Sequence, residues 1–321
     1  MIQYLLLFIF CAGLIYFATD IAVGSLMRMA RFLGWKEFVV AFFMMAFAAS
    51  VPNFFVGFSS ALRGIPELSF GDVAGNNLVA LTLVVSLAVF FVKGKVIPVE
   101  SRAIRSASVF TTIAVFLPLL LVLDGNLSRI DGVLLISFFV FYIVWLFSKE
   151  ERFKKVYGDH NHAEPPVKQF KFFIKDIGKL FLSALILIAA TQGIIISAQF
   201  FSLSFHTPLI LIGILITGPI SALPEIYFGV TSARRGQTWM VLGNLIGAVI
   251  IPTTLVLGSV AIINPIEKID FETFAIARLF LMLAAISFLV SVKTEHRITR
   301  TEAVILILIY VVFVVVEVLT K

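Results

Sequence analysis

SVPNFFVGFSSALRGIPELSFGDVAGNNL, residues 50–78, returns at residues 222–250 as ALPEIYFGVTSARRGQTWMVLGNLIGAVI. The two stretches align without a gap at an offset of 172 residues. Most identical positions are Gly, Pro or small residues, which set backbone geometry and allow close helix contact. The chain therefore contains an internal repeat. The identical pairs are Pro52/Pro224, Gly57/Gly229, Ser60/Ser232, Ala61/Ala233, Arg63/Arg235, Gly64/Gly236, Gly71/Gly243 and Gly75/Gly247.

The composition excludes a soluble protein. Of 321 residues, 60% are apolar and 14% are charged, and the mean hydropathy is +1.07. Residues 38–62, 180–205 and 236–266 carry no charge, and each is longer than the roughly 20 helical residues that cross a bilayer core. None shows the polar stripe of a soluble helix. Cys11 is the only cysteine, so an intrachain disulfide is excluded.

We expect an all-α polytopic membrane protein of ten transmembrane helices. If successive loops alternate between two sides, 20 Lys and Arg fall on one side and 5 on the other. Basic residues are retained in the cytoplasm, so both termini are predicted to be non-cytoplasmic. These basic clusters are topology signals, and no nucleic-acid partner is expected. The predicted spans are 2–27, 38–62, 71–92, 104–123, 131–148, 180–203, 208–233, 238–263, 274–292 and 302–319.

The domain organisation follows from the repeat. Residues 1–148 form a first five-span repeat. The internally repeated segment in this half, named alpha repeat 1, covers about 46–92. Residues 180–321 form the second, with alpha repeat 2 at about 217–263. Because each half has an odd number of spans, the copies enter the membrane from opposite sides. Inverted repeats are typical of secondary transporters, whose substrate sites lie near the midplane at interrupted helices.

Residues 149–179 are predicted to be a cytoplasmic linker. Within it, KQFKFFIKDIGK, residues 168–179, is predicted to form a basic amphipathic helix at the membrane surface. His160 and His162 are interpreted as part of a solvated loop rather than as a metal site, and no thiol lies near them in the sequence.

Glu225 is the main candidate functional residue. It follows Pro224, which interrupts the helix, and it is the only acidic residue between Thr207 and Ala233. A charge near the bilayer centre costs roughly 2.5–3.5 kcal/mol, so such a residue is a functional hypothesis by default. The alternative is a neutral structural carboxyl group. The repeat mate of Glu225 is Asn53, an amide that offers an oxygen but no charge.

Other polar residues surround the two helix breaks. Asn76 and Asn77 are expected to bind an ion or water, with interhelical hydrogen bonds as the alternative. Ser50 and Ser221 precede the breaks and either offer hydroxyl ligands or bond back to their own helices. Further acidic and amide residues are given other roles: helix capping for Asp72 and Asn244, snorkelling or helix pairing for Asp20, and an interfacial position for Glu317.

These motifs resemble those of the sodium/calcium exchanger family. Its two alpha repeats each resemble G-T-S-L-P-E followed by G-N-V-x-G-S-N. Here residues 48–53 read AASVPN and residues 71–77 read GDVAGNN. The second copy reads PISALPE at 219–225 and GNLIGAV at 243–249. Residues 18–24, ATDIAVG, also resemble the opening helix of the family. The resemblance implies a cation antiporter with ten spans in two inverted repeats.

The site motifs depart from the family pattern. One Glu is replaced by Asn53, and an Asn or Asp of the second copy by Val249. A motif Thr is replaced by Ala49, and a motif Ser by Ala222. Carried over position by position, the metal-binding site would consist of Asn53, Asn77 and Glu225, with an apolar fourth corner. Calcium takes six to eight oxygens with charge compensation, so one carboxylate favours a monovalent ion or a proton.

The sequence therefore predicts a secondary-active cation antiporter with a midplane site and alternating access. One alternative is a proton- or sodium-coupled exchanger without high calcium affinity. Another is a transport-inactive homologue with an interaction or regulatory role. An enzyme is not expected, because no nucleophile–base pair or cofactor loop is visible. No cofactor is expected, and the transported ions are Na⁺, Ca²⁺ or H⁺. The expected partners are inorganic cations and lipid, and the expected location is a prokaryotic plasma membrane.

Overall fold

The computed structural model describes residues 1–32, 46–47, 50–99, 102–148, 166–267, 269, 271–294 and 296–320. Nine helical segments in these ranges are long and apolar enough to cross a membrane. The prediction of an all-α polytopic membrane protein is therefore confirmed. The nine segments are Ile2–Leu26, Pro66–Phe91, Ile104–Asp124, Arg129–Ser148, Phe173–Phe205, Leu209–Arg234, Thr238–Ile263, Glu272–Lys293 and Arg300–Leu319.

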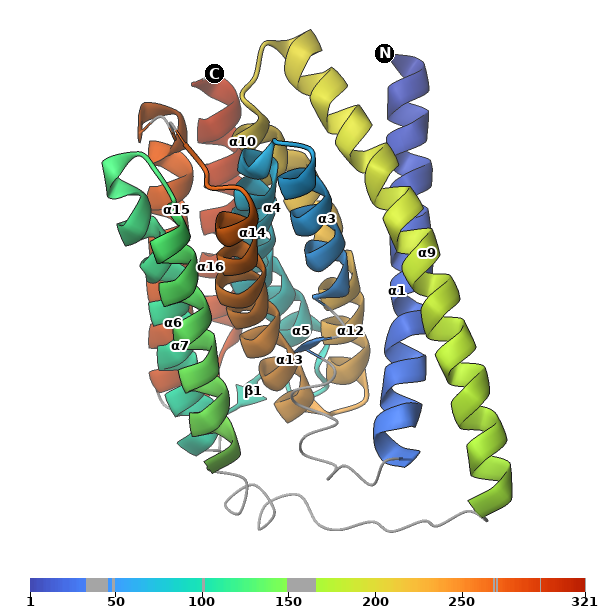
Figure 1. The fold of residues 1–321 in the computed structure, drawn as a ribbon. Coiled ribbons are helices and arrows are strands. Elements are labelled where there is room, and N and C mark those ends of the chain that lie inside the picture. The colour runs from blue at the N-terminus through green and yellow to red at the C-terminus, as the bar shows by residue number, and fades with distance from the viewer. Residues whose placement is uncertain are drawn as a thin grey trace.

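The remaining predicted span, 38–62, is the second in chain order and falls largely outside the described residues. Its described part is helix α3, Val51–Leu62, which has 12 residues and is shorter than a full crossing. The other nine predicted spans each coincide with one of the nine segments. The total of ten stays a prediction. Both termini lie at the same end of the bundle (Figure 1), as an even number of crossings requires.

Short helical pieces join end to end to form several of the spans. In the first half these elements are α1 (Ile2–Phe32), α3 (Val51–Leu62), α4 (Pro66–Val79), the π-helical turn η2 (Ala80–Val84), α5 (Val85–Phe91), β1 (Ile97–Pro98), α6 (Arg102–Leu121), η3 (Val122–Asp124) and α7 (Arg129–Ser148). In the second half they are α9 (Pro166–Phe205), α10 (Leu209–Ile212), the π-helical η4 (Gly213–Thr217), α11 (Gly218–Ser221), α12 (Leu223–Arg234), α13 (Thr238–Ile250), the π-helical η5 (Ile251–Val256), α14 (Leu257–Ile263), α15 (Phe271–Lys293), β2 (Arg297–Ile298) and α16 (Arg300–Leu319).

The sequence repeat is also a structural repeat. At the offset of 172 residues, α3 corresponds to α12 with identical bounds, and the π-helical turn η2 corresponds to η5. The turn after each of α3 and α12 contains a glycine with positive φ, 75° at Gly64 and 77° at Gly236. Only glycine adopts this conformation freely, so the turn requires the identity seen in the sequence.

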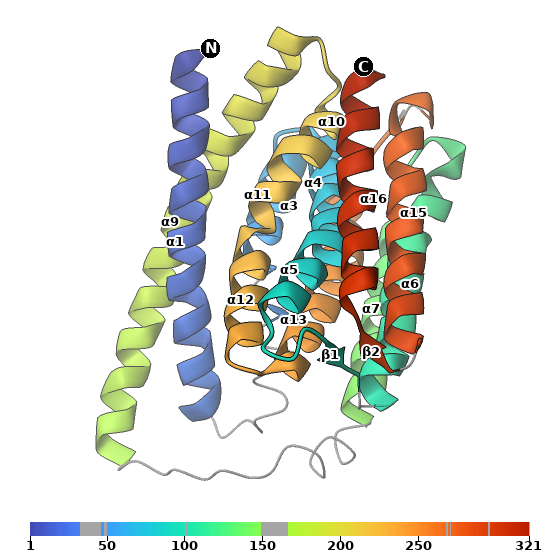
Figure 2. The same ribbon diagram turned by 180° about the vertical axis from the view of Figure 1, so that it is seen from behind.

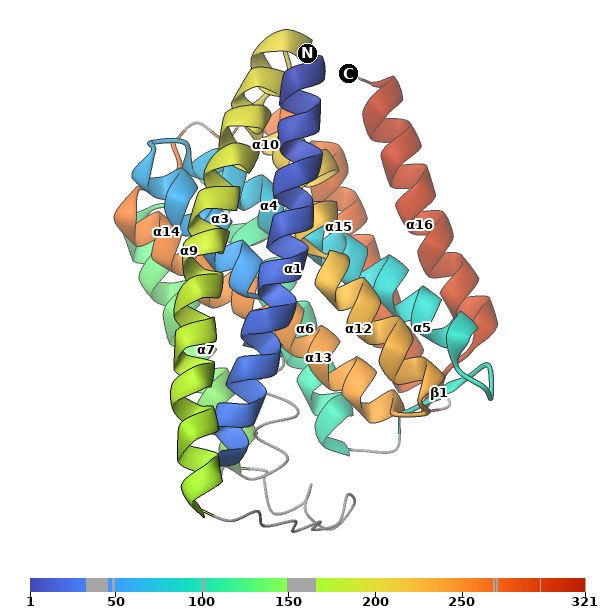
Figure 3. The same cartoon turned by 90° about the vertical axis from the view of Figure 1, so that its right-hand side faces the viewer.

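The two copies have opposite orientations. The α3–α4 turn and the α12–α13 turn lie at opposite ends of the bundle (Figures 1 and 3). Two loop contacts agree with the predicted alternation of sides. Ile97 pairs with Ile298 in the β1–β2 ladder, which joins two loops predicted to be cytoplasmic. Leu127 pairs with Ile266, which joins two loops predicted to lie outside.

Helices α1 and α9 pack together along one side of the bundle (Figure 2). The Arg28 guanidinium donates to both carboxylate oxygens of Asp176, at 2.7–3.1 Å, and ties the two helices together. The prediction of a separate surface helix at 168–179 is wrong, because these residues are the first turns of the 40-residue α9. The pairing with α1 extends the helix past the apolar span. His160 and His162 lie outside the described residues.

The largest hydrophobic cluster involves α4 to α7 and α13 to α16. Two charged residues on α15 and α16 are buried. Arg278, which belongs to the predicted span 274–292, lies within α15 and is 5% exposed. Glu317, predicted to be interfacial, is fully buried near the end of α16. Because α15 packs on α16, helix packing shields both side chains from lipid.

The side assignment predicts the labelling of two exposed positions. Thr294→Cys, in the loop before β2, is expected on the cytoplasmic side, and Thr320→Cys on the opposite side. In intact cells a membrane-impermeant thiol reagent should label only the Thr320→Cys variant. After permeabilisation it should label both variants. The unmodified chain is the control, because Cys11 is 4% exposed. Equal labelling of both variants in intact cells would contradict the assignment.

Candidate functional site

Glu225 lies where the seventh predicted span is interrupted. Helix α11 ends at Ser221, and α12 begins at Leu223 with Pro224 in its first turn. Proline is tolerated there because first-turn N–H groups have no helical partner. The Glu225 side chain is fully buried. Neither carboxylate oxygen has a hydrogen-bond partner among the described residues. The chain therefore holds a membrane-embedded carboxyl group at a helix interruption.

Helix α4 crosses the interrupted helix in backbone contact. A Cβ atom built on Gly71 would lie 2.1 Å from the carbonyl oxygen of Ile210, and one on Gly75 would lie 2.3 Å from that of Ile214. A Cβ built on Gly218 would lie 2.7 Å from the Cα of Gly75. These glycines bring the polar residues of α4 against the α11–α12 break. The close crossing explains why small residues recur in the repeat.

Asp72 uses this close crossing. It is 1% exposed, and its Oδ1 accepts a hydrogen bond of 2.8 Å from the Ser221 hydroxyl. The capping role predicted for Asp72 is wrong, since α4 begins at Pro66 and Asp72 lies well inside it. The same correction applies to Asn244, which lies inside α13. The predicted span 71–92 starts five residues after α4 does, whereas the predicted span 238–263 starts at the first residue of α13.

Asn53 and Ser50 occupy the corresponding break in the first repeat. Asn53 is 1% exposed, and neither end of its amide has a partner within the described ranges. The Ser50 hydroxyl donates to the carbonyl oxygen of Ala46 at 2.9 Å. Ser50 thus follows the alternative of bonding to its own helix, and its oxygen keeps a free lone pair. Ser221 differs, since its hydroxyl group donates to Asp72 on another helix.

Asn76 and Asn77 lie on α4 beside the close crossing. Asn76 is fully buried, and neither atom of its amide group has a partner in the described part of the chain. The Asn77 nitrogen donates to the Thr253 hydroxyl at 2.7 Å, a bond between the two repeats. Its carbonyl oxygen has no described partner. Asn77 therefore forms an interhelical hydrogen bond, which was the alternative to ion binding, and its carbonyl oxygen still lacks a described partner and could bind a ligand.

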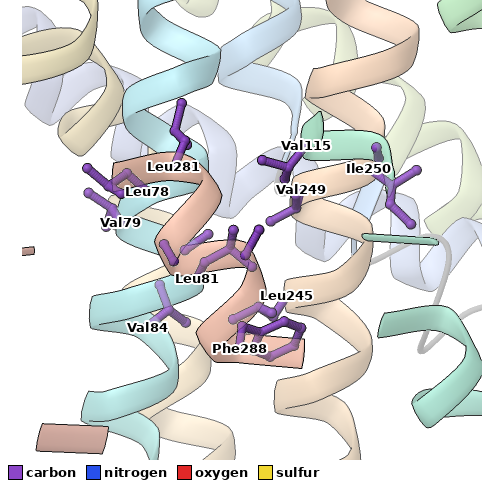
Figure 4. Packing of buried hydrophobic residues seen from close by; sticks show 14 of the residues in the cluster. Leu78, Val79, Leu81, Val84, Val115, Leu245, Val249, Ile250, Leu281 and Phe288 are labelled. Atoms are coloured by element: carbon purple, nitrogen blue, oxygen red, sulfur yellow. The ribbon is translucent and has the colours of Figure 1, made fainter. Parts of the chain in front are cut away.

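Val249, the expected apolar corner of the site, packs among hydrophobic side chains. It belongs to the largest hydrophobic cluster, and Figure 4 shows it beside Val115. The residue is fully buried. Val249 is therefore a packing residue between α13 and α6, and an acidic residue at this position would face an apolar environment.

The structure adds one residue that the sequence interpretation missed. Asp72 bonds to Ser221, which lies four residues before Glu225, so its carboxyl group lies beside the α11–α12 break. The missed signal was an acidic residue in a buried apolar helix, which is costly unless it has a role. Within the described residues no three His, Cys, Asp or Glu side chains are grouped together. A cation here would therefore use the two carboxyl groups, amides and hydroxyls.

Comparisons with known proteins agree with the fold described above. The model of the family described as "Sodium/calcium exchanger protein" matches residues 3–148 and 176–319. The sodium/calcium exchanger MaX1 of Methanosarcina acetivorans is 23% identical, over 95% of this chain and 96% of that protein. Among solved structures, the sodium-calcium exchanger NCX_Mj superposes with a TM-score of 0.66 at 19% identity, covering 98% of both chains. The H⁺/Ca²⁺ exchanger CAX superposes with a TM-score of 0.76 at 14% identity, covering 98% of this chain and 86% of that one.

Proposed function

Because the chain belongs to the sodium/calcium exchanger protein family, we propose that it is a secondary-active cation antiporter working by alternating access. The observation that carries the proposal is Glu225, a fully buried carboxyl group at the interrupted helix of an inverted repeat. Its oxygens have no partner among the described residues. A buried carboxylate requires a compensating charge, which a transported cation or a proton supplies.

The remaining ligands would be neutral. Asn53, Asn76 and Asn77 each offer an amide oxygen that is buried and has no described partner. Ser50 and Ser221 flank the two breaks with hydroxyl oxygens that already donate their protons. Oxygen ligands of this kind suit hard cations such as Na⁺ and Ca²⁺.

The inverted repeat provides the two access directions. Helices α3 and α12, which contain the two repeated prolines, have opposite orientations, and α4 packs against both α3 and α11. Rocking of one repeat against the other would expose the same ligands first to one side and then to the other. The MaX1 and CAX names concern exchange of calcium for sodium and for protons, respectively, and either ion is a candidate for the coupling ion here.

Ion flux in liposomes tests the proposal. Purified full-length protein is expected to take up ⁴⁵Ca²⁺ when an outward gradient of Na⁺ or of H⁺ is imposed, and the gradient that works identifies the coupling ion. Uptake should vanish when both gradients are dissipated by ionophores. A monodisperse protein that moves none of the three ions would contradict the antiporter function and favour an interaction or regulatory role.

A further inference from the structure

The first repeat departs from the family pattern that it resembles at two positions, Asn53 and Asp72. The family pattern has Glu at the position of Asn53, whereas it has Asn at the position of Asp72. The second repeat keeps the pattern at both matched positions, with Glu225 and Asn244. Compared with that pattern, the first repeat carries its acidic residue on the following helix instead of at the position of Asn53.

The fold places this acidic residue beside the other break. Ser221 donates to Asp72 at 2.8 Å and lies four residues before Glu225. Four helical residues correspond to about 6 Å along the axis. The backbone contact of Gly218 with α4 makes this approach possible, because a Cβ on Gly218 would lie 2.8 Å from the Asp72 carbonyl oxygen. Asp72 thus reaches across the interface between the repeats.

The remaining oxygens are available for a ligand. Asp72 Oδ2 and both Glu225 oxygens are buried and have no partner in the described part of the chain. Among the described residues, neither carboxyl group forms an ion pair with a Lys or Arg. Two carboxylates that interact in a buried place require positive charge between them. The Ser221 bond occupies only one oxygen and orients the other.

We propose that Asp72 is the second charged ligand of the cation site and replaces the charge that Asn53 lacks. The inference rests on the proposed function, and it gives the cation site two carboxyl groups instead of the one that the sequence motifs predict. With Asp72 and Glu225 both ionised, the site carries two negative charges and balances one divalent cation. The monovalent preference that follows from Glu225 alone therefore does not hold for the folded protein.

Direct binding of Ca²⁺ to the purified full-length protein tests the proposal. Asp72→Asn restores the family residue, keeps the shape and removes one charge. Its affinity for Ca²⁺ is expected to fall at least tenfold, with a smaller change for Na⁺, because the attraction scales with ion charge. Asp20→Asn is the matched control, since it removes an exposed carboxyl group from a span and should bind Ca²⁺ as the wild type does.

Two further variants separate charge from structure. Ser221→Ala removes the hydrogen bond but keeps the charge, so a charged role predicts a smaller loss than for Asp72→Asn. Equal losses would show that the charge of Asp72 adds nothing beyond its bond to the Ser221 hydroxyl, and would overturn the proposal. Asn53→Glu in the Asp72→Asn background returns the charge to the break and should recover part of the affinity. This recovery also shows that a loss does not come from misfolding.

The outcomes distinguish this inference from the function. If Glu225→Gln abolishes Ca²⁺ binding while Asp72→Asn binds normally, Asp72 is not a ligand, and the antiporter function stands. If the wild type binds Na⁺ but no divalent cation, the two-charge site is wrong. If the wild type neither binds nor transports any cation, the proposed function fails, and this inference fails with it.

Discussion

Glu225→Gln is expected to reduce cation flux in liposomes to the level of protein-free liposomes. The substitution keeps the size and shape of a fully buried side chain and removes its charge. A cation would then lose its strongest ligand in a place of low dielectric, where the attraction between charges is largest. Flux by the wild type should also fall as the pH drops, because protons compete with the cation for the carboxylate.

The control for this experiment is Asp20→Asn, which neutralises an exposed carboxyl group on α1. Both variants should elute as monodisperse protein and melt near the wild-type temperature, since no described hydrogen bond depends on the Glu225 carboxylate. Normal flux through Glu225→Gln would place the site elsewhere in the bundle. An inactive wild type would favour the transport-inactive alternative.

Gly75→Ala is expected to have the largest effect on folding. The added methyl group would lie 2.3 Å from the carbonyl oxygen of Ile214, and that atom belongs to the backbone of a neighbouring helix. A flexible side chain would move aside, but two packed helices have to separate. Overpacking of this kind typically costs 1–3 kcal/mol and occasionally more. We expect a clear fall in the melting temperature in detergent, with loss of monodispersity.

Gly178→Ala provides the matched control. A Cβ built on Gly178 in α9 meets no atom within 4 Å, and replacing Gly by Ala inside a helix contributes roughly 0.5–1 kcal/mol to stability. This variant should melt at or above the wild-type temperature. If Gly75→Ala and Gly178→Ala melted alike, the close crossing of α4 with the interrupted helix would be refuted.

The sequence by itself determined the membrane class and the repeat. Uncharged runs long enough to cross a bilayer leave a chain few alternatives, because backbone polar groups in lipid must be paired within helices. The identity of Gly64 and Gly236 predicted equivalent turns, and both adopt positive φ. Signals of this kind are local, since each depends on a residue and its chain neighbours. Pro224, the residue before Glu225, also predicted from the sequence that Glu225 lies at a helix break.

The tertiary structure decided which side chains meet. Asp72 looked like a helix cap, and only the crossing of α4 over α11 shows that it bonds to Ser221, 149 residues later. Val249 looked like a missing ligand, but the packing of α13 on α6 gives it an apolar environment. The burial of Arg278 and Glu317 likewise depends on the packing of α15 on α16. Periodicity assigns a residue to a helix, but the face that meets another helix depends on crossings set by residues far away in the chain. The charge of the candidate site is for this reason a property of the fold rather than of either repeat motif.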